Sequence, residues 1–485
     1  MKSSSKYLLM ILVFALALRL IFFSGADHSD SLLYYTYSDQ AAKGEFKPEL
    51  NHFSSRIGII YPQALVYRIF GVNEAASNIL PLIFSISGII LTFHLGKLLF
   101  NEKTGLIAAF LLSFFPLDVI FSTRLLPDFP SAFFMALCVF LFLRAEKENS
   151  RKYYFLSGLS LGISYLMKEI AVLMALFFAA YVVYKKRFKK EYFLVALGFL
   201  LFVLVELLHA YSITGSPFYR HTQIESEEVA YLLETYSNYF TPAGMLSRLF
   251  LHWPFFMLHD IHYGIFFVFI FIAAYYSILN RKESTNILLI WIIVLMLYLN
   301  FGTLSIRDYI PIPITAKFLS IIMFPSILLL ANFLSKDDRI VKKVFMPSAL
   351  LVLLLSSIGF VYMSDERLII KEIKQSFPFV EKQSKEIYTD ERTKMVYDYL
   401  FGFDGNNVNA FNRFDLYSGS EKNELVDLRD KHDVFVVINN AMIKGLPLVY
   451  KDIRFPEQAV NIPKSWQPIE QFGSGNRQVV IYYVP

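Results

Sequence analysis

The stretch YLLMILVFALALRLIFFSGADHSDSLLYYTYSDQAAKGEF, residues 7–46, passes from an apolar run into a segment rich in aspartate and tyrosine. Residues 7–24 come close to the roughly 20 apolar residues that an α-helix needs to cross a bilayer. The run resembles a secretory signal, but Arg19 lies inside it and no small-x-small cleavage site precedes the charged segment. We therefore expect a retained membrane span, followed by a segment that emerges on the far side of the membrane.

The composition of the whole chain is that of a membrane protein. Of its 485 residues, 55% are hydrophobic and 17% aromatic, and only 18% are charged, whereas about a quarter are charged in soluble domains. Apolar runs recur up to residue 363 and then stop. We predict a polytopic α-helical membrane protein with about eleven spans, at residues 7–24, 76–98, 105–123, 128–144, 153–167, 170–184, 192–211, 261–279, 286–302, 317–334 and 344–363.

Basic residues orient these spans, because lysine and arginine are retained on the cytoplasmic side. Short loops hold them in clusters such as KKRFKK, residues 185–190. We therefore place the N-terminus in the cytoplasm of a multi-pass plasma-membrane protein, and an odd number of spans puts the C-terminus outside. The formal net charge of +5 lies largely in the inner loops, so we expect no nucleic-acid partner.

Three long segments are predicted outside the membrane: residues 25–75, residues 212–260 and the tail from Ser364. The first is predicted to form two amphipathic surface helices, Asp30 to Lys43 and Arg56 to Phe70. In the tail, KEIYTDERTKMVYDYL is typical of a strand, an Asp390 cap and a helix, and DVFVVINN and RQVVIYYV are typical of strands. We predict a transmembrane domain at residues 1–363 and a small extracytoplasmic α/β domain at residues 364–485.

The first candidate site residue is Asp30, at the start of the first predicted surface helix. Tyr34 is four residues further on and would share one face of that helix, and Tyr35 follows it. A carboxylate near a helix start also caps the helix and favours its dipole. The residue alone fits both a structural and a catalytic role.

Asp128 emerges in the tight turn STRLLPDFPSAFF, just before the next predicted span. Pro127 and Pro130 flank it and restrict the backbone there. A carboxylate so close to hydrocarbon is costly and often marks a functional site, although an N-cap on the span is an alternative. Arg124 beside it is either an ion-pair partner or an anion ligand.

Lys168 and Glu169 separate two apolar runs with nothing else polar nearby. They form either a structural ion pair or part of a cavity shared with Asp128. Lys317 is the first residue of a predicted span and lies at its outer end. A lysine at this position can also extend its amine to the membrane surface without binding a ligand. Asp30, Asp128, Lys168 and Lys317 are all predicted at the outer membrane surface, a level that suits an enzyme acting on a phosphorylated lipid.

The sequence does not firmly predict a cofactor. Cys138, the only cysteine, excludes internal disulfides and cysteine-ligated zinc, and we expect it to pack in the core. A divalent cation is possible at the segment LHWPFFMLHDIHYG, where His259 and His262 could share a helix face. Interfacial aromatic segments also favour histidine.

Three glutamates, Glu225, Glu227 and Glu228, lie on the second long outer segment. They form either a solvated face or an acceptor-contacting surface.

A family resemblance follows from the segment that begins RIGIIYPQALVYRIF and ends MALCVFLFLRA, residues 56–145. It resembles the core of the C-type membrane glycosyltransferase superfamily, in particular its dolichyl-phosphate-mannose protein mannosyltransferase and aminoarabinose transferase group. The resemblance covers residues 1 to about 335. It implies an enzyme that takes a sugar from a polyprenyl-phosphate carrier at the outer face of the membrane.

The resemblance also implies roles for individual residues. DSLLY matches the family's acidic-acidic-x-x-tyrosine signature, which makes Asp30 the expected catalytic base, although Ser31 stands where glutamate is usual. The family's second-loop aspartate falls on Asp128, its Lys-Glu pair on Lys168 and Glu169, and its basic-aromatic pair on Lys317 and Phe318. Asn78 stands where the family often has arginine, which puts the contact of that arginine in doubt.

The chemistry implied is base catalysis with inversion. Asp30 would deprotonate an acceptor hydroxyl as it attacks the anomeric carbon, and Lys168, Lys317, Arg56 or Arg124 would bind the leaving lipid phosphate. The acceptor would be a protein, a lipid or a glycan. The alternatives are a lipid or glycan transporter, for which we see no pairing of internal repeats, and a non-catalytic membrane scaffold.

Overall fold

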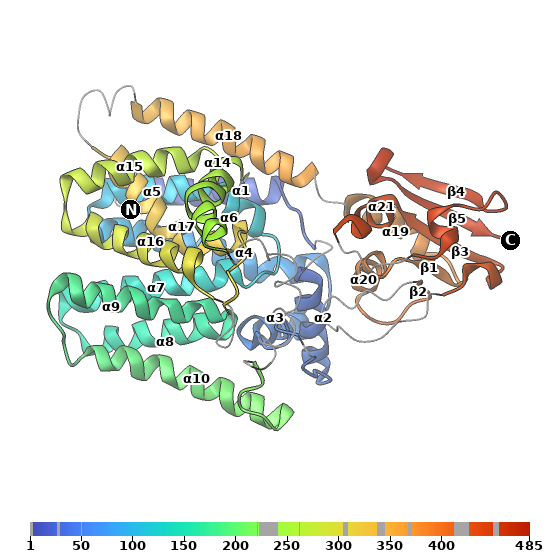
Figure 1. Ribbon diagram of the computed structural model, residues 1–485, viewed down its shortest axis with the longest axis horizontal. Coiled ribbons are helices and arrows are strands. Elements are labelled where there is room, and N and C mark those ends of the chain that lie inside the picture. Colours follow the sequence, from blue (N-terminus) through green and yellow to red (C-terminus); the bar gives the residue numbers. More distant parts are fainter. Residues whose placement is uncertain are drawn as a thin grey trace. The chain divides into compact units, whose positions relative to one another are not determined.

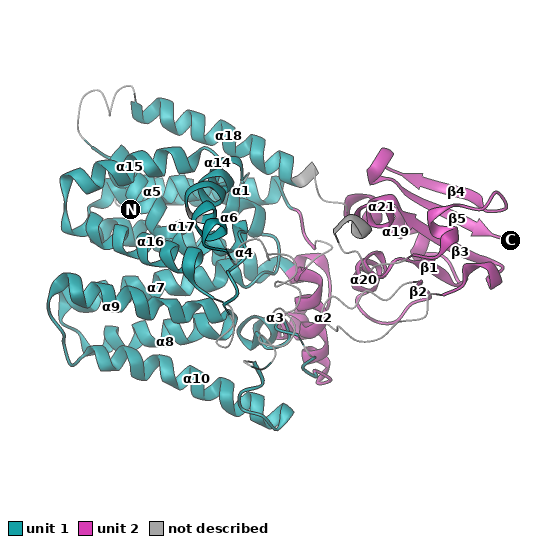
Figure 2. Cartoon of the chain, viewed as in Figure 1, with its two compact units in different colours: residues 1–23, 47–62, 78–366 teal, residues 24–46, 63–77, 367–485 magenta. Residues whose placement is uncertain are grey.

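A computed structural model describes residues 3–26, 30–49, 51–220, 222, 241–260, 262–303, 309–336, 345–366, 370–411, 426–449 and 455–485. The chain folds into two compact units (Figure 2). Unit 1 comprises residues 1–23, 47–62 and 78–366, and unit 2 comprises residues 24–46, 63–77 and 367–485. Unit 2 thus takes two segments of the predicted first outer loop as well as the tail; the predicted domain boundary between residues 363 and 364 stays a prediction.

Unit 1 contains long apolar helices typical of a multi-pass membrane protein (Figure 1). In the described part of the chain, seven helices are long and apolar enough to cross a bilayer. The apolar stretch of α17 is 78% buried and that of α10 only 22%, so α17 lies inside the helical body and α10 turns apolar side chains outward. The seven are α1 (Ser3–Ile21), α4 (Glu74–Leu99), α7 (Asp128–Glu148), α10 (Tyr192–Thr214), α16 (Glu283–Phe301), α17 (Ser320–Leu334) together with the 3₁₀ turn Ala316–Leu319 that precedes it, and α18 (Met346–Glu366).

The other predicted spans coincide with shorter or broken helices. The run at residues 105–123 breaks before Pro116 into α5 (Glu102–Ser113) and α6 (Pro116–Phe121), because proline has no N–H to continue the first helix. The count of about eleven spans therefore stays a prediction. The remaining elements of unit 1 are α8 (Arg151–Met167), the 3₁₀ helix η1 (Glu169–Leu173), α9 (Met174–Lys185), α13 (Pro242–Ser247), the π-helical turn η3 (Arg248–His252), α14 (Trp253–His259), α15 (Phe266–Asn280) and the 3₁₀ helix η4 (Ala316–Leu319).

Helix α8 packs between α7 and α10 (Figure 1). The packing depends on small residues, since a Cβ atom added to Gly158 would lie 2.1 Å from the carbonyl oxygen of Val195, and one added to Gly162 would lie 2.7 Å from Phe202. Glycines four residues apart let two membrane helices approach closely. On the other side of α8, Ser157 Oγ lies 3.2 Å from the sulfur of Cys138, which is buried in the core as expected. This packing fixes the ends of α7, α8 and α10, where the charged residues lie.

The two predicted surface helices of the first outer segment are present as α2 (Asp30–Lys43) and α3 (Ile57–Phe70). Residues Asp30 and Tyr34 both belong to α2, so the predicted shared face is confirmed. Gly44, with φ +79°, and Gly71, with φ +72°, follow the two helices and end them in the left-handed conformation that glycine adopts without strain.

The tail forms a five-stranded sheet with the strand order β2-β1-β3-β5-β4. Strands β2, β1 and β3 run parallel, and β5 pairs antiparallel with β3 and β4. The predicted strand, cap and helix near residue 390 are confirmed, because the Asp390 carboxylate accepts a hydrogen bond of 3.0 Å from the Thr393 N–H at the start of α20. The elements are α19 (Ile370–Glu381), β1 (Ile387–Thr389), α20 (Glu391–Leu400), β2 (Val408–Ala410), η6 (Leu428–Asp430), β3 (Val434–Asn439), α21 (Asn440–Val449), α22 (Glu457–Val460), β4 (Gln467–Phe472), η7 (Gly475–Arg477) and β5 (Val479–Val484).

Candidate functional site

Asp128 forms a buried ion pair with Lys168 in unit 1. The two side chains are only 4% and 7% exposed. Asp128 is the first residue of α7, and its N-cap is Pro127, with no side-chain cap bond. The N-cap alternative for Asp128 is therefore wrong, because the carboxylate is directed to the lysine amine.

Lys168 lies between α8 and η1 in an extended conformation, with φ −154° and ψ 132°. Its amine also lies 4.5 Å from the centre of the Phe318 ring, which belongs to η4. The hydroxyl of Ser320, two residues further on, donates a hydrogen bond of 3.3 Å to the Asp128 carbonyl oxygen. The start of α7, the end of α8 and the start of α17 thus meet around one lysine.

Glu169 pairs with two arginines rather than with its neighbour Lys168. Its Oε1 accepts from Arg56 Nη2 at 3.1 Å, and its Oε2 accepts from Arg220 Nη2 at 3.0 Å. Although burial opposes ionisation, the guanidinium groups of Arg56 and Arg220 outweigh it and hold the pKa of Glu169 well below its usual range. The predicted ion pair between Lys168 and Glu169 is therefore wrong, because the two adjacent side chains have different partners. Lys168 pairs with Asp128 instead.

Arg220 and Glu206 extend this network, and neither was predicted from the sequence. Arg220 is 1% exposed, and its Nη1 lies 3.0 Å from the Tyr165 carbonyl oxygen and 3.6 Å from Glu206 Oε1. The Tyr165 hydroxyl donates to Glu206 Oε2 at 2.8 Å. A signal was present, because Glu206 lies within the apolar run at residues 192–211, where a carboxylate needs a partner.

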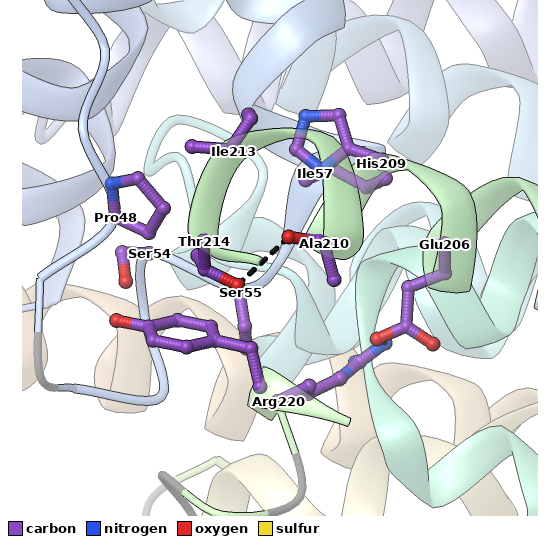
Figure 3. Close-up of a pocket in the computed structure, with 11 residues that line it drawn as sticks. Pro48, Ser54, Ser55, Ile57, Glu206, His209, Ala210, Ile213, Thr214 and Arg220 are labelled. Atoms are coloured by element: carbon purple, nitrogen blue, oxygen red, sulfur yellow. Dashed lines mark hydrogen bonds and ion pairs between the residues drawn. The ribbon is translucent and has the colours of Figure 1, made fainter. Parts of the chain in front are cut away.

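A small hollow lies next to this network, between the first outer segment and the end of α10 (Figure 3). Its enclosed space is about 20 Å³, little more than a water molecule needs. Figure 3 shows the side chains of Glu206 and Arg220 directed toward one another along its edge. Further lining residues are Pro48, Ser54, Ser55, Ile57, His209, Thr214 and Tyr219.

The other predicted cations lie near the same helix ends. Arg124 is buried in the turn between α6 and α7, four residues before Asp128. Lys317 is half-buried in η4, next to the Phe318 ring that lies over Lys168. Lysine and arginine therefore outnumber the carboxylates where α7 and α17 begin.

Asp30, Tyr34 and Tyr35 belong to unit 2. Asp30 begins α2 and is half-buried, whereas Tyr34 and Tyr35 are fully buried. Tyr35 stacks on Tyr399 of α20 at 5.0 Å between ring centres, a contact that holds the first surface helix against the tail domain. The predicted roles of these three residues in catalysis and substrate binding stay predictions, and Asp27 lies outside the described residues.

The histidines do not form the predicted arrangement. Helix α14 ends at His259, and Asp260 is extended, so His259 and His262 do not share a helix face. His259 Nδ1 lies 2.9 Å from the Phe255 carbonyl oxygen, and His262 Nδ1 lies 3.2 Å from Asp260 Oδ2. Among the described residues no cluster of three or more histidine, cysteine or acidic side chains could hold a metal. The glutamates Glu225, Glu227 and Glu228 lie outside the described residues.

Part of the chain matches a known protein family. Residues 57–209 match the family described as dolichyl-phosphate-mannose-protein mannosyltransferase. Among curated protein sequences there is no significant match.

Solved structures also resemble the chain in fold. ArnT from Cupriavidus metallidurans in the apo state has a TM-score of 0.65 at 12% identity, over 99% of this chain and 98% of that chain. The same enzyme bound to undecaprenyl phosphate has a TM-score of 0.61 at 11% identity, over 99% and 98%. The apo oligosaccharyltransferase of Archaeoglobus fulgidus has a TM-score of 0.57 at 14% identity, over 98% and 74%. These findings confirm the predicted resemblance to the C-type membrane glycosyltransferases.

Proposed function

We propose that the protein transfers a sugar from a polyprenyl-phosphate carrier to an acceptor hydroxyl or amide at the outer face of the membrane. The observation that carries the proposal is the cluster of Lys168, Arg56, Arg220 and Lys317 with two carboxylates at the helix ends of unit 1. Two further findings support it: the match to a mannosyltransferase family and the likeness to an ArnT structure bound to undecaprenyl phosphate.

The cations supply what the leaving group needs. As the bond between the anomeric carbon and the phosphate oxygen breaks, negative charge develops on the lipid phosphate, and preorganised donors stabilise that charge. Arginine offers paired N–H groups for such oxygens, and lysine offers a compact charge. We assign Arg56, Lys168 and Lys317 to the carrier phosphate and Arg124 to the same group of anion ligands.

Asp30 supplies the base. For a hydroxyl acceptor, its carboxylate takes the proton as the oxygen attacks the anomeric carbon from the face opposite the phosphate, so the product has inverted configuration and the polyprenyl phosphate leaves. Asp128 holds Lys168 in place through their ion pair and so orients the cation toward the reacting centre. Tyr34 and Tyr35 position the helix that carries Asp30.

This chemistry requires that the charged helix ends lie on the outer side of the plasma membrane, with the N-terminus in the cytoplasm and the tail domain outside. A reporter fused after Pro485 and active only outside the cytoplasm would support this orientation. Cytoplasmic activity of the reporter would overturn it.

The experiment is turnover by Asp30→Asn. Asparagine is nearly isosteric but does not accept the proton, so turnover should fall by about two or more decades while carrier binding is retained. Asp27→Asn is the matched control and should do much less. If Asp27 proves essential and Asp30 dispensable, the proposed base is displaced by three residues; if neither matters, the transferase proposal fails.

A further inference from the structure

A single carboxylate joins two arginines in unit 1. Glu169 uses Oε1 for Arg56, at 3.1 Å, and Oε2 for Arg220, at 3.0 Å. Each guanidinium therefore fixes one oxygen of the same group. Because the Glu169 side chain is 34% exposed, its orientation depends on these partners more than on enclosure by the fold.

Arg220 is the more firmly held of the two arginines. It is 1% exposed, its Nη1 donates to the Tyr165 carbonyl oxygen at 3.0 Å, and its guanidinium lies 4.7 Å from the centre of the Tyr165 ring. Glu206, whose Oε2 accepts from the Tyr165 hydroxyl at 2.8 Å, lies 3.6 Å from the same arginine. Contacts with α8 and α10 thus fix the position of Arg220. Arg220 in turn fixes the position of the Glu169 carboxylate.

We propose that Arg220 is a positioning residue for the carrier-phosphate ligand Arg56 and acts through Glu169. This inference rests on the proposed function, because it takes Arg56 as a ligand of the lipid phosphate. Arg220 holds the Glu169 carboxylate, and the carboxylate orients Arg56 Nη2, so that the guanidinium keeps the direction it needs for a phosphate oxygen.

A purely structural role for Arg220 in joining α8 to α10 is less well supported. These helices already approach through Gly158 and Gly162, whose added Cβ atoms would meet Val195 and Phe202 at 2.1 Å and 2.7 Å. Close packing through glycine does not need a buried ion pair. We therefore expect the fold to tolerate the loss of Arg220 once the charge left on Glu206 is also removed.

The test measures binding of undecaprenyl phosphate to the purified full-length chain. Arg220→Ala combined with Glu206→Gln removes the arginine without leaving a buried charge, and it should weaken binding about tenfold, as expected for a displaced charge-assisted donor. Glu169→Gln should weaken binding to a similar degree. Combining all three changes should add little, because Arg220 and Glu169 act on Arg56 in series.

Two further variants make the test specific. Arg220→Lys keeps the buried positive charge but lacks the planar guanidinium that contacts Tyr165, Glu169 and Glu206 together. It should therefore bind undecaprenyl phosphate about as weakly as the Arg220→Ala, Glu206→Gln variant. Arg144→Ala, which removes an exposed pair with Glu148 one turn away on α7, should leave binding unchanged.

The outcomes separate this inference from the proposed function. If the wild-type chain binds undecaprenyl phosphate and Arg220→Lys binds it equally well, the positioning role is overturned. Fully additive losses in the combined variant would also overturn it, since Arg220 would then act independently of Glu169. If the wild-type chain itself does not bind undecaprenyl phosphate, the proposed function fails instead.

Discussion

Two buried clusters of charge in the described part of unit 1 differ in how they are closed. In the first, Arg19 and Asp118 pair with both side chains 0% exposed. Arg19 also donates to Ser85 Oγ at 2.6 Å and to the carbonyl oxygens of Ala15 and Ser113 at 2.8 Å. In the second, at the ends of α7 and α8, Glu169 remains about a third exposed, at 34%.

The difference distinguishes a structural ion pair from a candidate site. The Arg19 guanidinium uses all three of its nitrogens in four hydrogen bonds within the helical body, and so it joins α1 to α4, α5 and α6. The helix-end cluster, formed by Arg56, Asp128, Lys168, Glu169 and Arg220, divides its carboxylates among several cations and borders a hollow (Figure 3). We therefore propose that the incompletely enclosed network, and not the closed pair, carries the functional charges.

The largest effect should come from breaking the closed pair. Arg19→Ala leaves Asp118 buried without its cation, and loss of one partner of a buried ion pair costs roughly 3–5 kcal/mol of unfolding free energy. Equilibrium unfolding of the purified chain in detergent measures this loss. Binding of undecaprenyl phosphate by the fraction that folds should be unchanged.

The control for this variant is Arg19→Leu combined with Asp118→Leu. Removing both charges should restore most of the stability, because no uncompensated ion remains. If Arg19→Ala is as stable as the wild type, the structural assignment of the closed pair is wrong.

A further buried carboxylate, Asp390 in the tail domain, sharpens the comparison because its Oδ2 has no hydrogen-bond partner within the described structure. Burial raises the pKa of Asp390 from 3.8 to about 6. A raised folded-state pKa stabilises the protein below the unfolded-state pKa, and this stability is lost as the pH rises through the folded-state value. A shift of about two units corresponds to roughly 3 kcal/mol at most.

We therefore expect the tail domain to become less stable between about pH 4 and pH 7. Hydrogen exchange of the β1 and β3 amides in the full-length chain measures this loss. Asp390→Asn resembles the protonated form, keeps a capping side chain, and should abolish the pH dependence. An unchanged pH dependence in this variant would assign it to another group.

The smallest expected effect concerns Lys317 at the helix-end cluster. Loss of a close charge-assisted contact is worth roughly 1.5–3 kcal/mol, so Lys317→Ala should bind the carrier about ten- to a hundredfold more weakly. A binding titration with undecaprenyl phosphate measures this loss. Equal affinity would mean that Lys317 only extends its amine to the interface.

Local features of the fold could be predicted from the sequence. The first surface helix was predicted at Asp30 to Lys43 and has these bounds, because its turn residues and spacing are local signals. Strands β2 and β4 were not predicted. Strand β2 has only three residues, and β4 is a polar, exposed edge strand without alternation.

The partners of the charged residues could not be predicted, because they depend on how helices pack. Asp128 and Lys168 are forty residues apart, and only the contact between α7 and α8 brings them together. Glu206 and Asp118 did carry a signal, since each lies inside an apolar run and required a partner. Their partners, Arg220 and Arg19, follow from the three-dimensional structure alone.

The central claim is that the helix-end cluster, and not the closed pair, binds the carrier phosphate. The most direct measurement compares undecaprenyl phosphate binding by the wild-type chain, by Arg56→Ala combined with Lys168→Ala and Asp128→Asn, which leaves no buried carboxylate without its cation, and by Arg19→Leu combined with Asp118→Leu. We predict that the closed-pair variant binds like the wild type, whereas the helix-end variant binds at least about a hundredfold more weakly, because two charge-assisted contacts are lost. Equal binding by the wild-type chain and the helix-end variant would contradict the account.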